Sequence, residues 1–296
     1  MIYKRIAAVA AAVAVLAALL MLVSKPTAAA PLRALPRVVQ VGAGGSPAQN
    51  GQALVNALAD IAVANPAPSA TTPYLLKLGP GVYDVSAAAP NYVQMLDFVD
   101  IEGSGQGITR IRGSGGADVT GISSIVFGSV VVIGANQTEL RQLTVVNTSS
   151  ISRSSAAISV VDSSMRLTDI TAVAGTVTSN GSAFAIGVDL AHVDVDTVLI
   201  SRVTAIAKGS TSTVAIFALV AGGGDEVSMT EVRATSDNAA IGANGHRIEV
   251  RNSVLDAPAA AGSDEVRIFT SLISGIPGTN ACHLVYSTDI PFTQLC

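Results

Sequence analysis

The feature that most constrains the fold of this chain is a repeat of short, strand-like segments from Thr138 onward. In each segment an aliphatic anchor is followed, after two or three polar-leaning positions, by another aliphatic residue and a second strand-like stretch. The anchors lie 18 to 33 residues apart and are Leu140, Leu167, Ile200, Met229, Val250 and Ile268. Irregular spacing of this size is typical of solenoid coils with loops of variable length. A β-sandwich also has many short strands but would not obviously repeat one strand–corner–strand unit in this way. We therefore predict an all-β fold, a single-stranded parallel β-helix in which the anchors of successive coils stack in a shared interior.

Both open ends of such a solenoid need a cover, because unpaired strand edges associate with other chains. The stretch "NGQALVNALADIAVAN" predicts a capping helix over residues 50–64, with Asn50 as its N-cap and Leu54, Leu58 and Ile61 on one face. Residues 31–40 precede it as a linker or a first edge strand. We expect one β-helix domain over residues 31–296, closed at its far end by the tail 282–296.

The first thirty residues form a separate zone. Lys4 and Arg5 precede an apolar run over residues 6–23, and three alanines follow at residues 28–30. This order is typical of a secretory signal peptide. An uncleaved membrane anchor is the alternative, since 18 apolar residues can just span a bilayer. Either case predicts a secreted or cell-envelope protein, which is periplasmic or extracellular. Such a protein would contact a membrane only through residues 6–23, and only if the leader is not cleaved.

The charge of the chain argues against a nucleic-acid partner. The chain has 17 basic and 21 acidic residues, and loss of Lys4, Arg5 and Lys25 with the leader would leave 14 basic residues and a net charge of −7. The sequence contains no basic patch of the kind that would indicate a nucleic-acid partner.

The chain has two cysteines, Cys282 and Cys296. A disulfide between them would close a loop worth about 3 kcal/mol in the chain-entropy model; two free thiols are the alternative.

A family resemblance rests on two neighbouring stretches, "YLLKLGPGVYDV" and "VDIEGSGQGITRIRGSG". Gly79 and Gly81 permit a tight corner, Pro80 stiffens it, and Tyr83 can lie across the coil edge. Together with the capping helix, residues 38–116 resemble the N-terminal part of pectinesterase-like proteins of the right-handed parallel β-helix (pectin lyase-like) superfamily. The resemblance implies a right-handed β-helix and a link to carbohydrate chemistry.

The catalytic motifs of that family are absent. The motifs of the types QDTL, DFIFG and LGRPW do not occur, and the Asp97–Phe98 pair lies too early and lacks partners. The chain has no tryptophan, although sugar-binding grooves often use aromatic platforms. Neither the calcium site nor the arginine base of a pectate lyase is recognisable. The chain is most similar to uncharacterised bacterial β-helix repeat proteins with the same two stretches.

Two constellations remain as candidate sites. In "HVDVD" the side chains of His192, Asp194 and Asp196 would share one strand face and could bind calcium or act as acid and base. Four positions before the anchors stand polar residues that would form a ladder if the coils are in register. These are Asn136, Ser163, Asp196, Asp225, His246 and Asp264. Close carboxylates raise each other's pKa or attract a cation, so calcium at Asp194, Asp196 and Asp225 is a hypothesis. A column of Asp, Asn and Ser that satisfies turn backbone groups is the structural alternative.

Three functional hypotheses follow. In the first, the protein is an exported, non-catalytic β-helix that acts as a scaffold or weak glycan-binding surface and needs no cofactor. In the second, it is a divergent carbohydrate-active enzyme, a pectinesterase, polysaccharide lyase or glycoside hydrolase. Its catalytic candidates are Asp194, Asp196, Asp225 and Arg202, and Arg202 and Glu231 could flank the ladder. The ligand would be bound by His192, Asp196, Asp225, His246 and Asp264. In the third hypothesis, the protein adheres to a protein partner through an exposed sheet face.

Overall fold

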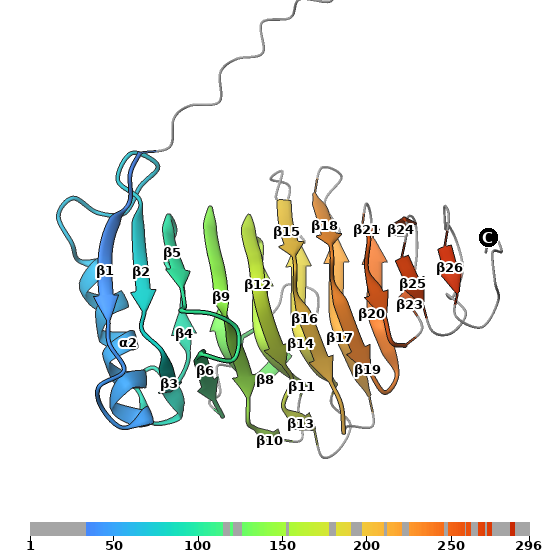
Figure 1. The fold of residues 1–296 in the computed structure, drawn as a ribbon, viewed down its shortest axis with the longest axis horizontal. Coiled ribbons are helices and arrows are strands. Elements are labelled where there is room, and N and C mark those ends of the chain that lie inside the picture. The colour runs from blue at the N-terminus through green and yellow to red at the C-terminus, as the bar shows by residue number, and fades with distance from the viewer. Residues whose placement is uncertain are drawn as a thin grey trace, which may run out of the picture. The chain divides into compact units, whose positions relative to one another are not determined.

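The computed structural model shows a stack of parallel coils with one helix at its N-terminal end (Figure 1). The coils belong to one compact unit that spans Ala34–Cys296. The residues that the structure describes are 34–114, 119–120, 126–151, 154–177, 182–190, 197–209, 212–220, 225–245, 248–257, 259–261, 266–269, 271–273 and 285–287. The predicted leader and both cysteines lie outside these residues.

Two sheets form the walls of the β-helix. The large sheet contains β1 (Arg37–Val41), β2 (Tyr74–Leu78), β3 (Gly81–Asp84), β5 (Val99–Glu102), β6 (Thr109–Gly113), β9 (Thr138–Asn147), β12 (Met165–Val173), β15 (Thr197–Ser201), β16 (Thr204–Ala207), β18 (Glu226–Thr230), β19 (Arg233–Ser236), β21 (Ile248–Arg251), β22 (Val254–Leu255), β24 (Val266–Phe269), β25 (Ser271–Ile273) and β26 (Val285–Ser287). The small sheet contains β4 (Val93–Gln94), β7 (Val119–Thr120), β8 (Val126–Ile133), β11 (Ser154–Val161), β14 (Ala183–Leu190), β17 (Thr213–Val220), β20 (Ala239–Gly245) and β23 (Ala259–Ala261). A third, short sheet pairs β10 (Ser150–Ile151) with β13 (Thr176–Val177).

The strand pairing is that of a parallel β-helix. Among the described strands every pairing is parallel except the one between β7 and β8. The chain alternates between the two sheets, from β11 to β12, then to β14, β15 and β17, and each strand pairs with its counterpart in the next coil. The predicted fold class is therefore confirmed.

The predicted anchors stack in register through the large sheet. Direct pairs join Leu140 to Leu167, Leu167 to Ile200, Ile200 to Met229, Met229 to Val250 and Val250 to Ile268. The column continues toward the N-terminus through Ile101, Leu76 and Val39. Its central members are fully buried. Burial of one such side chain stabilises the fold by roughly 1.5–3 kcal/mol, so the interior column is the main source of the stacking energy.

The small sheet supplies the opposite wall of the same interior. Its inward column runs in register through Val132, Ile158, Ile186, Ile216 and Ile241. All of these side chains are buried in one continuous apolar core with the anchors. Branched aliphatic side chains suit this position because they pack closely on a pleated surface.

The capping helix α2 spans Pro47–Ala62 and begins earlier than the sequence predicts. Ser46 is its N-cap and forms a capping box with Gln49. The prediction that Asn50 caps the helix is wrong, because this side chain is buried and donates to the carbonyl oxygens of Gly45 and Val82. The predicted apolar face is confirmed, since Leu54, Leu58 and Ile61 are buried. Among the described residues no helix is both long and apolar enough to span a membrane.

The corner in "LGPGVYD" joins β2 to β3. Gly81 has a φ of 146°, and an added Cβ would lie 2.5 Å from the Cβ of Ala43, so this position requires glycine. The ring of Tyr83 lies inside the first coil, fully buried, and its hydroxyl donates to the carbonyl oxygens of Val41 and Gly79. Burial raises the pKa of Tyr83. The tyrosine therefore ties the edge strand β1 to the first corner.

A second corner divides the large-sheet strands of successive coils. One residue per coil takes a left-handed conformation there, with φ between 49° and 56°: Gln142, Asp169, Arg202, Glu231 and Asn252. The pairs on either side place these five residues in one column. Left-handed backbone costs a non-glycine residue roughly 1–2 kcal/mol. We call this column the left-handed corner.

Candidate functional site on the outer face of the large sheet

The structure describes only part of the predicted polar ladder. His192, Asp194, Asp196, His246 and Asp264 lie outside the described residues, so the hypotheses about them stay predictions. Asn136 is exposed just before β9. Ser163 and Asp225 are only 3% and 2% exposed. At these two coils the ladder position therefore lies below the surface and does not line an open groove.

The exposed members of this edge bind the backbone of the next coil. The carboxylate of Asp97 accepts from the N–H of Asn136 at 2.8 Å, and the amide oxygen of Asn136 accepts from the N–H of Ser164 at 3.1 Å. The Ser164 hydroxyl in turn accepts from the N–H of Thr197 at 3.3 Å. Short polar side chains commonly satisfy turn amides in this way. This part of the edge is a structural corner column.

The predicted calcium site has no described counterpart. Within the residues that the structure describes, no group of three or more His, Cys, Asp or Glu side chains is placed to hold a metal ion. Of the three predicted ligands, Asp225 is described and buried, whereas Asp194 and Asp196 are not described. Calcium binding at these aspartates stays a prediction.

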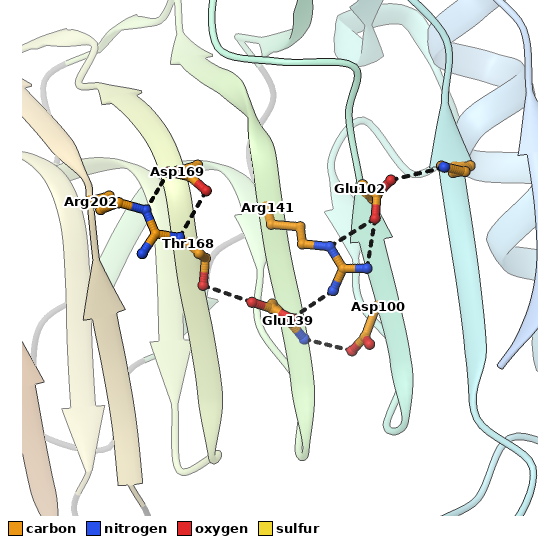
Figure 2. A network of polar contacts seen from close by, with 8 residues as sticks. Asp100, Glu102, Glu139, Arg141, Thr168, Asp169 and Arg202 are labelled. Atoms are coloured by element: carbon orange, nitrogen blue, oxygen red, sulfur yellow. Dashed lines mark hydrogen bonds and ion pairs between the residues drawn. The ribbon is translucent and has the colours of Figure 1, made fainter. Parts of the chain in front are cut away.

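A charged network instead occupies the outer face of β5, β9 and β12 (Figure 2). Arg141 on β9 lies between two carboxylates: its Nη2 is 2.6 Å from Glu102 on β5, and its Nη1 is 2.6 Å from Glu139. Lys77 on β2 extends the network to Glu102 at 3.1 Å. The hydroxyl of Thr168 on β12 donates to Glu139 at 2.7 Å. The network therefore ties four consecutive coils together.

The electrostatics of the network keep its central acid charged. Burial raises the pKa of Glu102, but hydrogen bonds from Arg141 and Lys77 outweigh that effect and hold the pKa below its usual range. Burial lowers the pKa of Arg141, but the hydrogen bonds that it donates to Glu102 and Glu139 outweigh this effect, and the pKa is raised. Glu102 is therefore ionised at neutral pH and cannot act there as a general acid, which requires a protonated group.

Arg202, a predicted flanking residue, belongs to the left-handed corner. Its Nε and Nη2 contact the two carboxylate oxygens of Asp169 in the preceding coil at 2.7 and 3.0 Å. Hydrogen bonds from Arg202 lower the pKa of Asp169. Glu231, the other flanking residue, occupies the next position of the same column. The two residues therefore occupy adjacent positions of the left-handed corner, and the prediction that they flank the aspartates of the ladder stays a prediction, because Asp194 and Asp196 lie outside the described residues.

The stretch "GSGQGI", residues 103–108, forms a loop beside the charged network. It joins β5 to β6 and crosses the outer face of the large sheet (Figure 1). The N–H of Gly107 donates to the hydroxyl of Thr144 on β9. The Gln106 side chain accepts from the Thr171 hydroxyl at 3.1 Å and donates to the Arg202 carbonyl at 3.4 Å. The loop therefore covers part of the face beside the charged network.

The network lies within a longer, in-register row of polar side chains on the large sheet. We call this row the polar stripe; it consists of Lys77, Glu102, Arg141, Thr168, Ser201, Thr230 and Arg251. Each residue directly follows an inward anchor, so it points outward by strand alternation. Sequence reasoning missed the stripe, although the signal was available: the position after each aligned anchor is polar in all of these coils.

These observations define the class of the protein, a parallel β-helix with a polar stripe on one outer face. No protein-family model matches the sequence, and no curated protein matches it either. Among solved structures, the chain is similar to the A-module of the mannuronan C-5 epimerase AlgE4 from Azotobacter vinelandii. The identity is 13% and the TM-score 0.33, over 81% of this chain and 72% of that one. The pectinesterase-like resemblance of residues 38–116 stays a prediction at the level of the family.

Proposed function

We propose that this protein is an exported, non-catalytic β-helix scaffold that binds uncharged glycan chains along the polar stripe. The observation that supports this most directly is the register of the stripe: seven consecutive coils each place one polar side chain in the same outward column. Neighbouring members are separated by the inter-strand spacing of about 4.8 Å. A regular row of hydrogen-bonding groups suits a repeating, hydroxyl-rich polymer.

The charge balance of the stripe favours an uncharged ligand. Its cations are Lys77, Arg141 and Arg251. Glu102 and Glu139 contact Arg141, and Glu249 contacts Arg251. Because each arginine is already matched by a carboxylate, neither a polyanion nor a polycation gains a strong electrostatic attraction here. The hydroxyls of Thr168, Ser201 and Thr230 lie between these charged ends.

The state of the acids supports binding over catalysis at this face. A glycosidase needs one carboxylic acid that stays protonated near neutral pH. Hydrogen bonds from Arg141 and Lys77 instead lower the pKa of Glu102. The competing function is a divergent carbohydrate-active enzyme that works through Asp194, Asp196 and Asp225 with Arg202, and it makes the opposite prediction about turnover.

Export is proposed from the N-terminal sequence alone. The basic residues, the apolar run over residues 6–23 and the three following alanines are the elements of a secretory signal. Cell fractionation with N-terminal sequencing of the mature protein tests this proposal. A protein found in the cytoplasm with an intact N-terminus would contradict it.

The binding proposal is tested on a glycan array that holds neutral polysaccharides and pectins, with and without calcium. We expect calcium-independent binding to neutral chains, reduced about tenfold by the double substitution Ser201→Ala and Thr230→Val. Thr204→Val, on the same sheet outside the stripe, is the matched control and should bind as the wild type does. Equal binding by all three proteins would contradict the stripe as the ligand site.

A turnover assay on pectins separates the scaffold from the enzyme. Reducing-end formation, unsaturated products and methanol release together cover hydrolase, lyase and esterase activities. We expect none above background. Sustained turnover that is lost in Asp196→Ala would overturn the non-catalytic proposal and support the enzyme.

A further inference from the structure

A groove lies at the N-terminal end of the β-helix, between β1 and α2. It has a volume of about 570 Å³, and β1 forms one wall through Val39 and Val41. The other wall is formed by residues of α2, among them Ala53, Ala57 and Ile61, and by Ala64 just after the helix ends. Figure 1 shows the helix beside this first strand. Three of the residues that line this wall are alanines, and their small side chains leave room for a further backbone to approach closely.

The edge of β1 that faces away from β2 is open. The N–H of Arg37 donates to the carbonyl of Pro73, and the carbonyl of Val41 accepts from the N–H of Gly79, so these alternate residues turn toward the β2 side. In a parallel strand the residues between them point their N–H and C=O groups to the opposite side. Those residues are Val38 and Gln40, and β2 is the one described strand that pairs with β1. The edge can therefore accept one more strand.

Exposed apolar side chains are concentrated at this end of the molecule. Leu35 is 93% exposed, Val38 53% and Val63 83%. They are three of the five large apolar side chains that are exposed among the described residues, and they lie on or next to the two elements that form the groove. None of the three lines the groove, so they show only that apolar surface is exposed next to the elements that form it.

The rim of the groove indicates the charge of its ligand. Asp60 on α2 is the one ionisable acid or base among the lining side chains apart from the phenol of Tyr74, and Asn56 lies one turn before it. Asp60 is exposed. A single carboxylate among lining side chains that otherwise carry no charge favours a ligand with a basic side chain at that point.

From these features we propose that the β1–α2 groove binds an extended peptide segment of another protein, which adds a strand to the edge of β1. A strand edge beside a helix is a known architecture for this mode of recognition. The peptide would place small apolar side chains against Ala53 and Ala57 and a lysine or arginine near Asp60. Its backbone would bond to the N–H and C=O groups of Val38 and Gln40. This site is independent of the polar stripe.

The test is a selection of random twelve-residue peptides displayed on phage against the immobilised full-length chain. We expect enriched peptides that alternate small apolar residues with polar ones and carry a basic residue. A selected peptide should lose about tenfold or more in affinity toward Ala57→Leu, which fills the groove, and toward Asp60→Lys. N-methylation of its alternate backbone amides should abolish binding, as strand addition requires.

Ala59→Leu is the matched control, because Ala59 lies on the same helix but lines the smaller hollow on its other side. It should bind the selected peptide as the wild type does, and circular dichroism should show the same fold for all variants. No enrichment over the Ala57→Leu protein would overturn the proposal. So would sedimentation that shows a self-association abolished by Ala57→Leu, because the occupant would then be a second copy of this chain.

Discussion

Arg202 lies in the coil directly after Asp169, and its guanidinium contacts both oxygens of that carboxylate at 2.7 and 3.0 Å. Both residues have left-handed backbone, with φ of 52° and 54°. The ion pair is exposed, so it contributes little to stability by itself. Its position is informative because it shows that the corner places long polar side chains of adjacent coils side by side.

The left-handed corner should tolerate a flexible residue and reject a β-branched one. Glu231→Val places a β-branched side chain at a φ of 56° and should lower the free energy of unfolding by about 1–2 kcal/mol. Gln142→Gly, at the same φ of 56° in this column, should be close to neutral, since glycine adopts this conformation freely. Urea denaturation followed by circular dichroism measures both. The control is Thr230→Val, one residue earlier in extended backbone, which should change stability little; equal losses at both positions would contradict the role of the corner.

Arg141 should be the most important residue of the charged network. Arg141→Met removes the shared partner of two half-buried carboxylates and should cost about 1–2 kcal/mol, between the values for exposed and for buried ion pairs. Lys77→Met removes one exposed contact to Glu102 and should cost under about 0.5 kcal/mol. The difference in thermal midpoint between the two variants tests the ranking. A larger loss for Lys77→Met would show that Arg141 does not organise the network.

Acid should weaken the same network. The pKa of Glu102 in the folded protein lies below its ordinary value of 4.5, so the charged form stabilises the fold above that pH. This contribution is lost as the pH falls through the lowered pKa. The stability difference between the wild type and Glu102→Gln should therefore be largest near neutral pH and shrink below about pH 4. In an Arg141→Met background, the effect of Glu102→Gln on stability should depend less on pH. An unchanged pH dependence would show that groups other than Arg141 lower the pKa of Glu102.

The interior of this fold could be predicted from the sequence because burial acts on each coil in the same way. Leu140, Leu167, Ile200 and Val250 all occupy the same aliphatic slot, so their alignment in the sequence predicts their register in space. The outer face could not be predicted to the same depth. The partner of Arg141 is Glu102, 39 residues earlier, and that pairing depends on the length of the intervening coil.

Loops and helix ends depend on contacts between distant residues that the repeat does not encode. Ser46, and not Asn50, caps α2 because the chain turns at Gly45, which leaves Asn50 inside to bond Val82. The side chain of Gln106 in the loop over residues 103–108 contacts Thr171 and Arg202, which belong to later coils, and no local sequence pattern predicts these contacts. Asp225 is a further example. A charged residue next to a strand is expected to be exposed, but this side chain is buried.

The last prediction concerns the attachment of the capping helix at Gly51. In an exposed helix interior, replacement of glycine by alanine stabilises by up to about 1 kcal/mol. Here an added Cβ would lie 2.0 Å from the carbonyl oxygen of Asp84, a backbone atom at the end of β3. A clash with backbone cannot be relieved by a side-chain rotation. The cost of this clash therefore outweighs the gain in helix propensity, and the substitution lowers the stability. Gly51→Ala should destabilise the protein by about 1–3 kcal/mol.

The matched control for that helix is Gly44→Ala, where no atom lies within 4 Å of the added Cβ, and its stability should stay within about 0.5 kcal/mol of the wild type. Hydrogen exchange should show faster exchange of the α2 amides in Gly51→Ala, with the central coils unchanged, because several strands of the large sheet separate those coils from the helix. Protection of α2 equal to that of the wild type would show that the helix is held elsewhere. In that case the close approach of Gly51 to Asp84 would not be what fixes the helix over the open end of the solenoid.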